Sequence, residues 1–314
     1  MSFLARVPSR VTVEEVGPRD GLQNEPRPVP TESKVAFLDR LAAAGLPVIE
    51  VTSFVSPAAV PQLADAHEVM RRLVRRPGTR YVALVPNLRG LERALAVGCD
   101  AIALFAAASE AFSQANVRAS IDETFRRFQP VAERARAAGL WIRGYVSTAF
   151  HCPYSGPIEP LQALTVAERL FALGCDEVAL ADTIGRATPR DVDSLLMRAV
   201  QLFDPGRLAL HFHDTAGLAL ANVMIGLDYG IAVFDASAGG LGGCPFAPGA
   251  PGNLATERLV ALLEGLGIET GVDRVAVAAA VAELHRAVPG IGARISCSCG
   301  WRSALGSAIR FSAG

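Results

Sequence analysis

The chain has 314 residues, of which 51% are hydrophobic and 19% charged, so it can form one large domain with a sizeable core, and intrinsic disorder is disfavoured. Its formal net charge of −1 gives no sign of a basic surface for nucleic acid or for an anionic membrane. Because residues 1–10 lack a signal-peptide core and no apolar run reaches about 18 residues, we expect a cytoplasmic protein, outside any membrane, whose six cysteines are reduced.

The most informative local pattern is a glycine that separates two kinds of segment. A run rich in alanine, leucine or arginine ends at the glycine, and a short apolar run follows within a few residues. The pattern occurs at Gly45, Gly98, Gly139, Gly174 and Gly230. Glycine commonly follows the last turn of a helix in a left-handed conformation, and the apolar run is typical of a strand buried on both faces. The repetition predicts βαβ units and a parallel sheet.

The pattern predicts eight strands with helices between them. In chain order the strands are Val11–Val16, Val48–Val51, Tyr81–Val85, Ala101–Ala106, Trp141–Ser147, Glu177–Leu180, Leu208–His213 and Val233–Ser237. The helices are Thr31–Ala44, Leu88–Val97, Ile121–Ala138, Pro160–Leu173, Pro189–Phe203, Leu218–Tyr229 and Asn253–Leu266. Eight such units over about 250 residues predict an α/β fold, the (β/α)8 TIM barrel. The alternative is an open, doubly wound sheet, but Gly17–Gly21 after the first strand lacks the glycine-rich dinucleotide pattern of that fold.

The domain organisation that we expect is a single catalytic barrel domain over residues 1–314. The barrel covers about residues 11–270, and no segment has the composition of a linker. A C-terminal helical or irregular extension follows at about residues 271–314, with a helical pattern at Val275–Ala287.

Two histidines end the seventh strand, at the carboxyl side of the barrel where active sites of this fold lie. His211 and His213 are two residues apart, so both imidazoles point to one face of the strand and can bind one metal ion. Asp20 supplies a carboxylate, since strands one, seven and eight become neighbours when the barrel closes. Nitrogen and oxygen ligands without a thiolate favour Mg²⁺, Mn²⁺ or a similar ion over structural zinc. The alternative is a pair of core histidines with hydrogen-bond partners.

A second polar feature is a glutamate within the otherwise apolar second strand. Glu50 requires a partner because burial of a lone carboxylate is costly, and Arg19 at the neighbouring strand end is the expected one. The pair is either a structural salt bridge or a fixed arginine that binds an anion beside the metal. Lys34, the only lysine, lies on the first predicted helix outside the barrel. A Schiff-base aldolase needs a lysine inside, so carbon–carbon cleavage here would have to use a metal.

Several motifs resemble, in order and spacing, those of 3-hydroxy-3-methylglutaryl-CoA lyases, which belong to a group of metal-dependent barrel enzymes named for an Asp-Arg-Glu triad. The motifs are Val16–Glu25, Val48–Glu50, Thr52–Pro57, Arg143–Ser147, Asp182–Gly185, His211–Thr215, Gly240–Pro245 and Gly252–Glu257, within about residues 11–272. The resemblance implies a lyase that cleaves 3-hydroxy-3-methylglutaryl-CoA to acetyl-CoA and acetoacetate, a step of leucine degradation and ketone-body formation. It implies an acyl-CoA substrate, Mg²⁺ or Mn²⁺ as cofactor, no nucleic-acid or membrane partner, and a homodimer as the arrangement to test.

The resemblance also implies a role for each matching residue. The metal ligands that it implies are Asp20, His211, His213 and Asn253. Arg19 would contact the thioester oxygen, Glu50 would orient Arg19, and the catalytic Cys244 would lie on a mobile glycine-rich loop that closes over the substrate. The substrate-binding residues implied are Arg19, Gln23, Ser53, Tyr145 and Thr183. The resemblance leaves open which group removes the hydroxyl proton; a histidine bound to the metal is a poor base, which favours Asp20 or Glu50.

Departures from the family pattern leave the substrate open. Ala216–Leu218 stand where Tyr-Gly-Gln is familiar, and Ala179 stands where a serine is familiar. A lyase for another branched 3-hydroxyglutaryl-CoA is therefore an alternative. A condensing enzyme of the same group, which forms a carbon–carbon bond from acetyl-CoA, is another, although such enzymes carry a long C-terminal regulatory extension. A barrel that only binds metal or a CoA ester is disfavoured by Arg19, Glu50 and Cys244.

Overall fold

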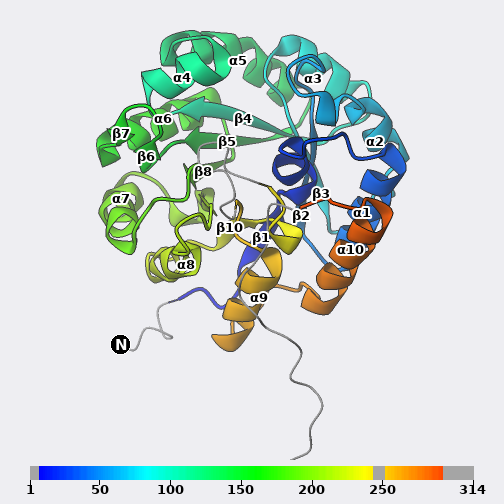
Figure 1. The fold of residues 1–314 in the computed structure, drawn as a ribbon. Helices are drawn as coiled ribbons and strands as arrows, with labels where there is room; N and C mark the ends of the chain where they lie inside the picture. The colour runs from blue at the N-terminus through cyan, green and yellow to red at the C-terminus, as the bar shows by residue number, and fades with distance from the viewer. Residues whose placement is uncertain (1–6, 243–251, 293–314) are drawn as a thin grey trace, which may run out of the picture.

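The computed structural model describes residues 7–242 and 252–292, which form a closed barrel of eight parallel strands ringed by helices (Figure 1). The barrel strands are β1 (Thr12–Glu15), β2 (Val48–Ser53), β3 (Arg80–Leu84), β4 (Ala101–Ala107), β5 (Trp141–Ser147), β8 (Glu177–Asp182), β9 (Leu208–Phe212) and β10 (Val233–Ala236). Around the barrel they run β1-β10-β9-β8-β5-β4-β3-β2, so the first and last strands close the sheet. The predicted (β/α)8 barrel is therefore confirmed.

Helices cover the outside of the barrel, and all but two of them match a predicted segment. Their bounds are α1 (Thr31–Ala43), α2 (Ala66–Arg72), α3 (Leu88–Leu95), α4 (Glu110–Val117), α5 (Ile121–Ala137), α6 (Pro160–Leu173), α7 (Pro189–Leu202), α8 (Ala219–Asp228), α9 (Thr256–Gly265) and α10 (Arg274–Ala287). The sequence patterns do not predict the short helices α2 and α4. They also place the start of α9 at Asn253, which is wrong, because Asn253 forms an antiparallel β-bridge with His213 instead.

The remaining ordered elements are short. A two-stranded antiparallel hairpin, β6 (His151–Cys152) with β7 (Gly156–Pro157), follows β5. Three single-turn 3₁₀ helices are η3 (Pro61–Leu63), η4 (Pro205–Arg207) and η5 (Ala238–Gly240). A turn of π-helix, η2 (Gly17–Gly21), follows β1 directly and carries two of the predicted site residues.

The glycines of the recurring pattern adopt the predicted conformation. The φ angles of Gly45, Gly98, Gly139, Gly174 and Gly230 are all positive, between 67° and 95°. Each of these glycines ends a helical segment before the next barrel strand, as the left-handed cap requires. Gly45 is also restricted by packing, because a β-carbon at this position would overlap the carbonyl oxygen of Gly271.

The core has two parts with different chemistry. A large apolar cluster fills the layer between the barrel strands and the helices, as expected from strands that are buried on both faces. A second, smaller cluster comprises Val48, Val82, Leu84, Ala101, Ala103, Tyr145, Ala179 and Ala209, all on barrel strands. Buried charged side chains from barrel strands, among them Glu14 of β1, Arg143 of β5 and Asp235 of β10, accompany it. The barrel interior therefore contains a polar layer as well as an apolar one.

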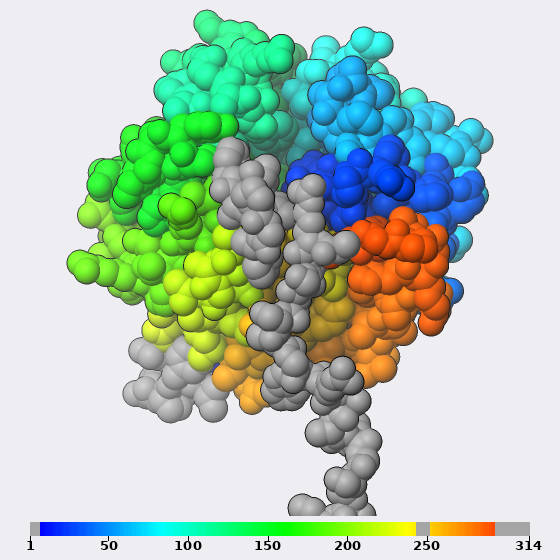
Figure 2. All heavy atoms as spheres, viewed as in Figure 1, coloured from blue at the N-terminus to red at the C-terminus, as the bar shows by residue number. Residues whose placement is uncertain are grey.

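The C-terminal helix closes the ring beside the N-terminal one. In Figures 1 and 2, the orange α10 lies against the blue segment that contains α1. Arg40 of α1 and Glu283 of α10 form an ion pair, and the amide of Asp273 donates to the carbonyl oxygen of Ala44 at 2.8 Å. Among the described residues, no helix combines the length and the apolar character needed to cross a bilayer.

Candidate metal centre and active site

The π-helical turn η2 places two charged side chains at the carboxyl end of β1. The carbonyl oxygen of Val16 accepts hydrogen bonds from the amides of Arg19 at 3.1 Å, Asp20 at 2.7 Å and Gly21 at 3.3 Å. This tight turn directs the adjacent Arg19 and Asp20 side chains over the mouth of the barrel. π-Helical turns are rare and occur frequently at functional sites.

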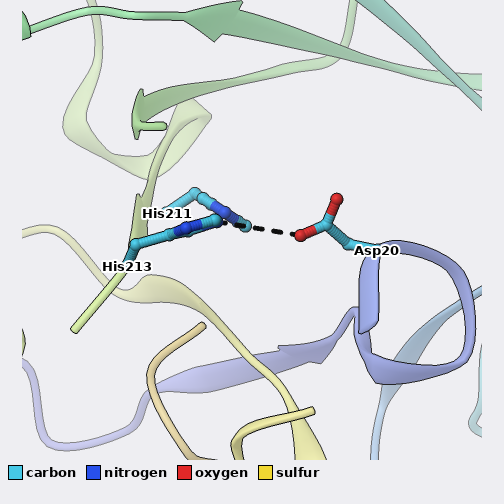
Figure 3. Close-up of side chains that lie close together, drawn as sticks. All are labelled: Asp20, His211 and His213. Carbon is cyan, nitrogen blue, oxygen red and sulfur yellow. Dashed lines mark ion pairs between the residues drawn. The ribbon is translucent and has the colours of Figure 1, made fainter. Parts of the chain in front are cut away.

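The predicted triad of metal-binding side chains converges at this mouth. His211 lies on β9 and His213 just beyond its end, and one ligand atom each of Asp20, His211 and His213 lie within 4.8 Å of one another. Figure 3 shows the two imidazoles facing the Asp20 carboxylate, with His213 Nε2 3.8 Å from Asp20 Oδ2. The side chains are largely buried, which favours direct binding of a cation by the protein over a fully hydrated one.

Asn253 completes the arrangement from a segment far along the chain. Its position is fixed by backbone hydrogen bonds on both sides, from Asp214 N to Gly252 O at 2.7 Å and from Leu254 N to Phe212 O at 3.0 Å. Its amide Nδ2 donates to Asp20 Oδ2 at 2.8 Å. Asn253 Oδ1 is buried and accepts no hydrogen bond within the described part of the chain. A buried acceptor without a donor is costly, and a cation would satisfy it.

The donor set fits a divalent cation. Two imidazoles, one carboxylate and one amide oxygen combine borderline and hard donors without a thiolate, as Mg²⁺ or Mn²⁺ sites do. Asp20 also suits such a role electrostatically. Burial opposes ionisation of this carboxyl, but Arg19 and the two histidines hold its pKa well below the usual value, so it is an anion.

The expected Arg19–Glu50 pair is present next to these ligands. Glu50 Oε2 accepts from Arg19 Nε at 2.7 Å and lies 2.6 Å from Arg19 Nη2, while Arg19 Nη1 donates to Asp20 Oδ1 at 2.7 Å. Burial raises the pKa of Glu50 to about 7, although Arg19 opposes this shift. The guanidinium is thus fixed between two carboxylates, and its orientation is set before any ligand binds.

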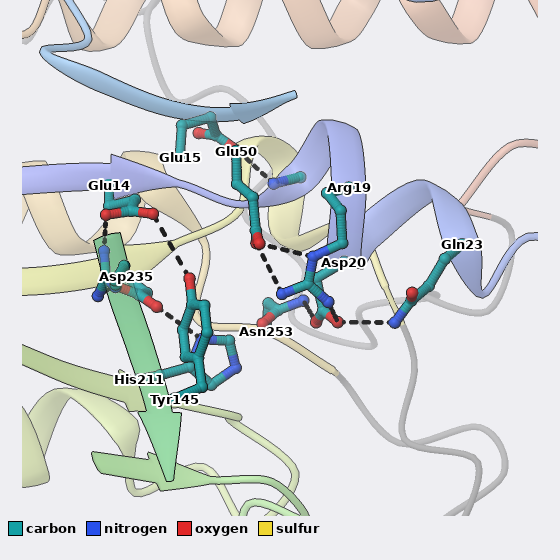
Figure 4. Close-up of polar contacts among 12 residues, drawn as sticks. Glu14, Glu15, Arg19, Asp20, Gln23, Glu50, Tyr145, His211, Asp235 and Asn253 are labelled. Carbon is teal, nitrogen blue, oxygen red and sulfur yellow. Dashed lines mark hydrogen bonds and ion pairs between the residues drawn. The ribbon is translucent and has the colours of Figure 1, made fainter. Parts of the chain in front are cut away.

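A further network, which the sequence patterns do not predict, lies next to His211 inside the barrel (Figure 4). Asp235 Oδ2 lies 3.0 Å from His211 Nδ1, and Asp235 Oδ1 accepts from Arg143 Nη2 at 2.6 Å. Arg143 also forms ion pairs with Glu14 and Glu177. Burial opposes ionisation of Asp235, but Arg143 and His211 hold its pKa below the usual value. A carboxylate in the middle of an apolar strand, the signal that identifies Glu50, is also present at Asp235.

The implied substrate-binding residues line one cavity, which Asp20, His211 and His213 also border. The cavity measures about 750 Å³, a usual size for a small-molecule site, and Gln23, Ser53, Tyr145 and Thr183 all border it. Gln23 Nε2 donates to Asp20 Oδ1 at 2.9 Å. The hydroxyl oxygen of Thr183 accepts from Thr148 N at 2.7 Å, so its proton is available to another acceptor.

Tyr145 contributes its ring more than its hydroxyl group to this cavity. Its hydroxyl lies 3.4 Å from Glu14 Oε1, on the side of the buried network, and its ring contacts His211 in a T-shaped arrangement with centroids 6.3 Å apart. Burial raises the pKa of Tyr145 well above its usual value, so the phenol stays neutral. Arg19 lies over the same ring, 5.9 Å from its centroid.

Two further residues of the sequence analysis are Cys244 and Lys34. Cys244, implied as catalytic, lies outside the described residues. Lys34 lies on α1, outside the barrel as predicted, with its ammonium group 2.6 Å from Asp65 Oδ1.

Comparisons with known proteins agree in sequence and in fold. A family model described as HMGL-like matches residues 10–284. The mitochondrial hydroxymethylglutaryl-CoA lyase of Rattus norvegicus is 50% identical over 272 residues, which cover 87% of this chain and 84% of the rat protein. The hydroxymethylglutaryl-CoA lyase structure from Pseudomonas aeruginosa superimposes with a TM-score of 0.89 at 49% identity, covering 90% of this chain and 95% of that one.

A second solved structure covers an even larger share of the chain. It is an HMG-CoA lyase from Acinetobacter baumannii in complex with coenzyme A and 3-methylmalate, with a TM-score of 0.88 and 37% identity. The match covers 99% of this chain and 100% of that one. The carboxyl transferase domain of Rhizobium etli pyruvate carboxylase also superimposes, with a TM-score of 0.65, but at 16% identity it shares the fold alone.

Proposed function

The chain belongs to the HMGL-like family, and from this premise we propose that the protein is a lyase that cleaves 3-hydroxy-3-methylglutaryl-CoA to acetyl-CoA and acetoacetate. The observation that carries the proposal is the convergence of Asp20, His211 and His213 at the barrel mouth, beside the buried Arg19–Glu50 pair. This is the arrangement that a metal-assisted carbon–carbon cleavage needs, because one developing charge lies on the hydroxyl oxygen and another on the thioester oxygen.

The cofactor in this proposal is Mg²⁺ or Mn²⁺. Asp20, His211, His213 and Asn253 would hold it, since their donor set and the buried Asn253 Oδ1 fit such an ion. When bound, the ion supplies a Lewis acid that lowers the pKa of the C3 hydroxyl group of the substrate.

The reaction is a retro-Claisen cleavage, and the side chains of the protein would stabilise the negative charge that develops on the acyl-CoA product. The C3 hydroxyl loses its proton, the C2–C3 bond breaks, and the electron pair moves to an enolate of acetyl-CoA that must then be protonated. Arg19 would donate hydrogen bonds to the enolate oxygen, and Glu50 holds the guanidinium in place for this task. For Cys244 we propose a part in protonating the enolate or in excluding water, as its match to the family cysteine implies.

The acyl-CoA substrate is supported by the cavity. Its wall continues from the metal-binding side chains to the aromatic side chains of Phe112, Phe128 and Tyr154, which suit a thioester and its alkyl chain. Ala179 stands where a serine is familiar, so a lyase for another branched 3-hydroxyglutaryl-CoA stays the alternative.

The function is tested with purified protein, Mn²⁺ or Mg²⁺, and a panel of 3-hydroxyacyl-CoA esters. We expect release of acetyl-CoA and acetoacetate from 3-hydroxy-3-methylglutaryl-CoA, loss of turnover in Asp20→Ala, and full turnover in His67→Ala, whose side chain is exposed on α2. Turnover that persists after complete chelation would contradict the metal-assisted reaction, and faster cleavage of another ester would reassign the substrate.

The proposal also includes a cellular location and an oligomeric state. The cytoplasmic location stays a prediction, because one similar lyase of Rattus norvegicus is named as mitochondrial and another as cytoplasmic. A homodimer likewise stays a prediction, and light scattering of the purified protein measures it directly.

A further inference from the structure

We propose that Asp235, held by Arg143, is a positioning residue that fixes the tautomer of His211 so that Nε2 faces the cation. The inference rests on the proposed metal centre, but its first test uses metal-free protein. It concerns the buried side of the histidine, opposite to the side that lines the cavity.

The backbone places the two side chains together. Asp235 on β10 and His211 on β9 are paired in the register of these adjacent parallel strands, so their side chains project to the same side of the sheet. Both residues are buried, with 2% and 6% of their surface exposed, and Asp235 Oδ2 lies 3.0 Å from His211 Nδ1. Water cannot easily replace either partner at this depth, so the imidazole has one fixed neighbour.

The chemistry of the pair selects one tautomer. An ionised carboxylate has no proton to donate, so the short contact to Nδ1 is a hydrogen bond only if the imidazole donates it. In a neutral imidazole the other nitrogen, Nε2, then carries the lone pair that a metal ion requires. Metal-bound histidines commonly donate their second nitrogen to a carboxylate in this way.

Arg143 keeps Asp235 in the role of acceptor. Its Nη2 donates to Asp235 Oδ1 at 2.6 Å, which leaves Oδ2 to the imidazole. Arg143 comes from β5, across the barrel from β10, and none of its surface is exposed. Glu14 forms a further ion pair with the same guanidinium through Nη1, so a second carboxylate helps to hold the arginine in place.

The Tyr145 ring fixes the remaining freedom of the histidine. It lies 4.9 Å from Arg143 Cζ on one side and meets the His211 ring edge-on, at an interplanar angle of 87°. A hydrogen bond and an aromatic contact together define both the tautomer and the rotation of the imidazole. The Glu14–Arg143–Asp235 layer thus supports the metal centre from within the barrel.

The first experiment measures the tautomer by ¹⁵N NMR of histidine-labelled, metal-free protein at alkaline pH, with the His211 signals assigned from the His211→Gln variant. We expect a protonated Nδ1 and an unprotonated Nε2 in the wild type. In Asp235→Asn the amide group can donate to Nδ1, so a substantial fraction of the ring should change to the other tautomer. A wild-type His211 with its proton on Nε2 would overturn the proposal, whether or not the variant folds.

The second experiment measures Mn²⁺ affinity by titration calorimetry or electron paramagnetic resonance. Asp235→Asn should bind Mn²⁺ about 10–100-fold more weakly, as loss of a supporting carboxylate typically does. Its kcat should recover when the Mn²⁺ concentration is raised, with KM for the acyl-CoA little changed. An unchanged Mn²⁺ affinity would refute the role.

Glu177→Gln is the matched control. Glu177 contacts the same guanidinium, 3.4 Å from Arg143 Nη1, but it lies on β8 and has no contact with His211 in the described structure. It should retain the wild-type tautomer and Mn²⁺ affinity, and an equal loss in both variants would show a merely structural role for the layer. If the expected tautomer and affinities are found without any lyase activity, the proposed substrate fails while the positioning role stands.

Discussion

At the scale of single residues, the charged side chains of this site form buried ion pairs, and each pair fixes the orientation of its members. Arg19 is the clearest case, because Glu50 and Asp20 hold three of its nitrogen atoms at 2.6–2.7 Å. A guanidinium presents several donors in one plane, whereas an ammonium presents a single point of charge. The geometry therefore predicts that the two cations are not interchangeable at this position.

Arg19→Lys should lower kcat by about 10²–10³-fold, the usual cost of losing one donor to a developing oxyanion. Steady-state kinetics with 3-hydroxy-3-methylglutaryl-CoA measure this. Arg40→Lys, at the exposed ion pair with Glu283, is the control and should keep wild-type kinetics. Comparable rates for Arg19→Lys and the wild type would remove Arg19 from the proposed chemistry.

Glu15 predicts a dependence of stability on pH. Its carboxyl accepts from the amides of Gly17 and Ala238, each at 2.8 Å, and from the Thr256 hydroxyl at 2.7 Å, yet burial raises its pKa to about 8. Because the pKa of Glu15 in the folded state lies above its ordinary value of 4.5, the contribution of this carboxyl to stability is complete below that ordinary value. The contribution is lost as pH rises through about 8.

The measurement for Glu15 is urea unfolding at about pH 6 and about pH 8. The free energy of unfolding should fall between these values in the wild type. It should fall by less in Glu15→Gln, whose amide does not ionise, whose oxygen can still accept from Gly17 and Ala238, and whose NH2 group can donate to the Thr256 hydroxyl oxygen. Glu168→Gln, on the exposed face of α6, should follow the wild type. Parallel profiles for wild type and Glu15→Gln would show that this carboxyl ionises normally in the folded state.

The parts of the site that lie at strand ends can be predicted from the sequence. His211 and His213 share a face because of their spacing, and Asp20 reaches them because the barrel closes. The contact between Asp235 and His211 is not predicted. The sequence of β10 shows a carboxylate in an apolar strand, but it does not show which side chain of the adjacent strand β9 this carboxylate contacts. The same limit applies to Arg143, whose partner Asp235 lies 92 residues further along the chain.

At the scale of secondary structure elements, helix ends are better specified than short helices. α2 and α4 have seven and eight residues and no glycine cap, so their apolar periodicity is too brief to separate from that of a loop. The start of α9 is misplaced because Asn253 reads as a helix cap, whereas tertiary pairing with His213 holds it in an extended bridge. Residues near a helix end, such as the capping glycines, therefore specify where most helices stop. Tertiary contacts override them at a few positions, such as Asn253.

Gly45→Ala tests the glycine caps. A left-handed alanine costs about 1–2 kcal/mol by itself, and its β-carbon would also overlap the carbonyl oxygen of Gly271, so overpacking adds about 1–3 kcal/mol. Gly139→Ala is the matched control, since Gly139 has φ +74° but no atom within 4 Å of an added β-carbon. Urea unfolding should show a larger loss for Gly45→Ala, and equal losses would contradict the role of packing at Gly45.

At the scale of the whole molecule, the proposed metal centre joins segments from the first and the last units of the barrel sequence. Asp20 follows β1, the histidines lie at the end of β9, and Asn253 precedes α9, so a bound ion would link the seam where the barrel closes. A ligand that binds only the folded state stabilises it by mass action. The fold and its metal site should therefore be linked thermodynamically.

Mn²⁺ at 100 times its Kd should stabilise the chelator-treated protein by about 2.7 kcal/mol. Thermal unfolding with and without the ion measures this gain, and Asp20→Ala should lose it. His67→Ala should keep it, because this exposed side chain lies away from the site. A melting temperature of the wild type that does not change when Mn²⁺ is added would be evidence against a high-affinity site.

The burial of Lys34 gives the molecule an internal reporter of unfolding. This single lysine has 4% of its surface exposed, and its ammonium group donates to Gln62 O at 2.5 Å and contacts Asp65. Amine-acylating reagents should therefore spare its ε-amino group while α1 is docked and modify it once that docking is lost. The mass spectrometric signal of the acylated Lys34 peptide, followed over time, would then measure the rate at which α1 undocks, without an engineered dye.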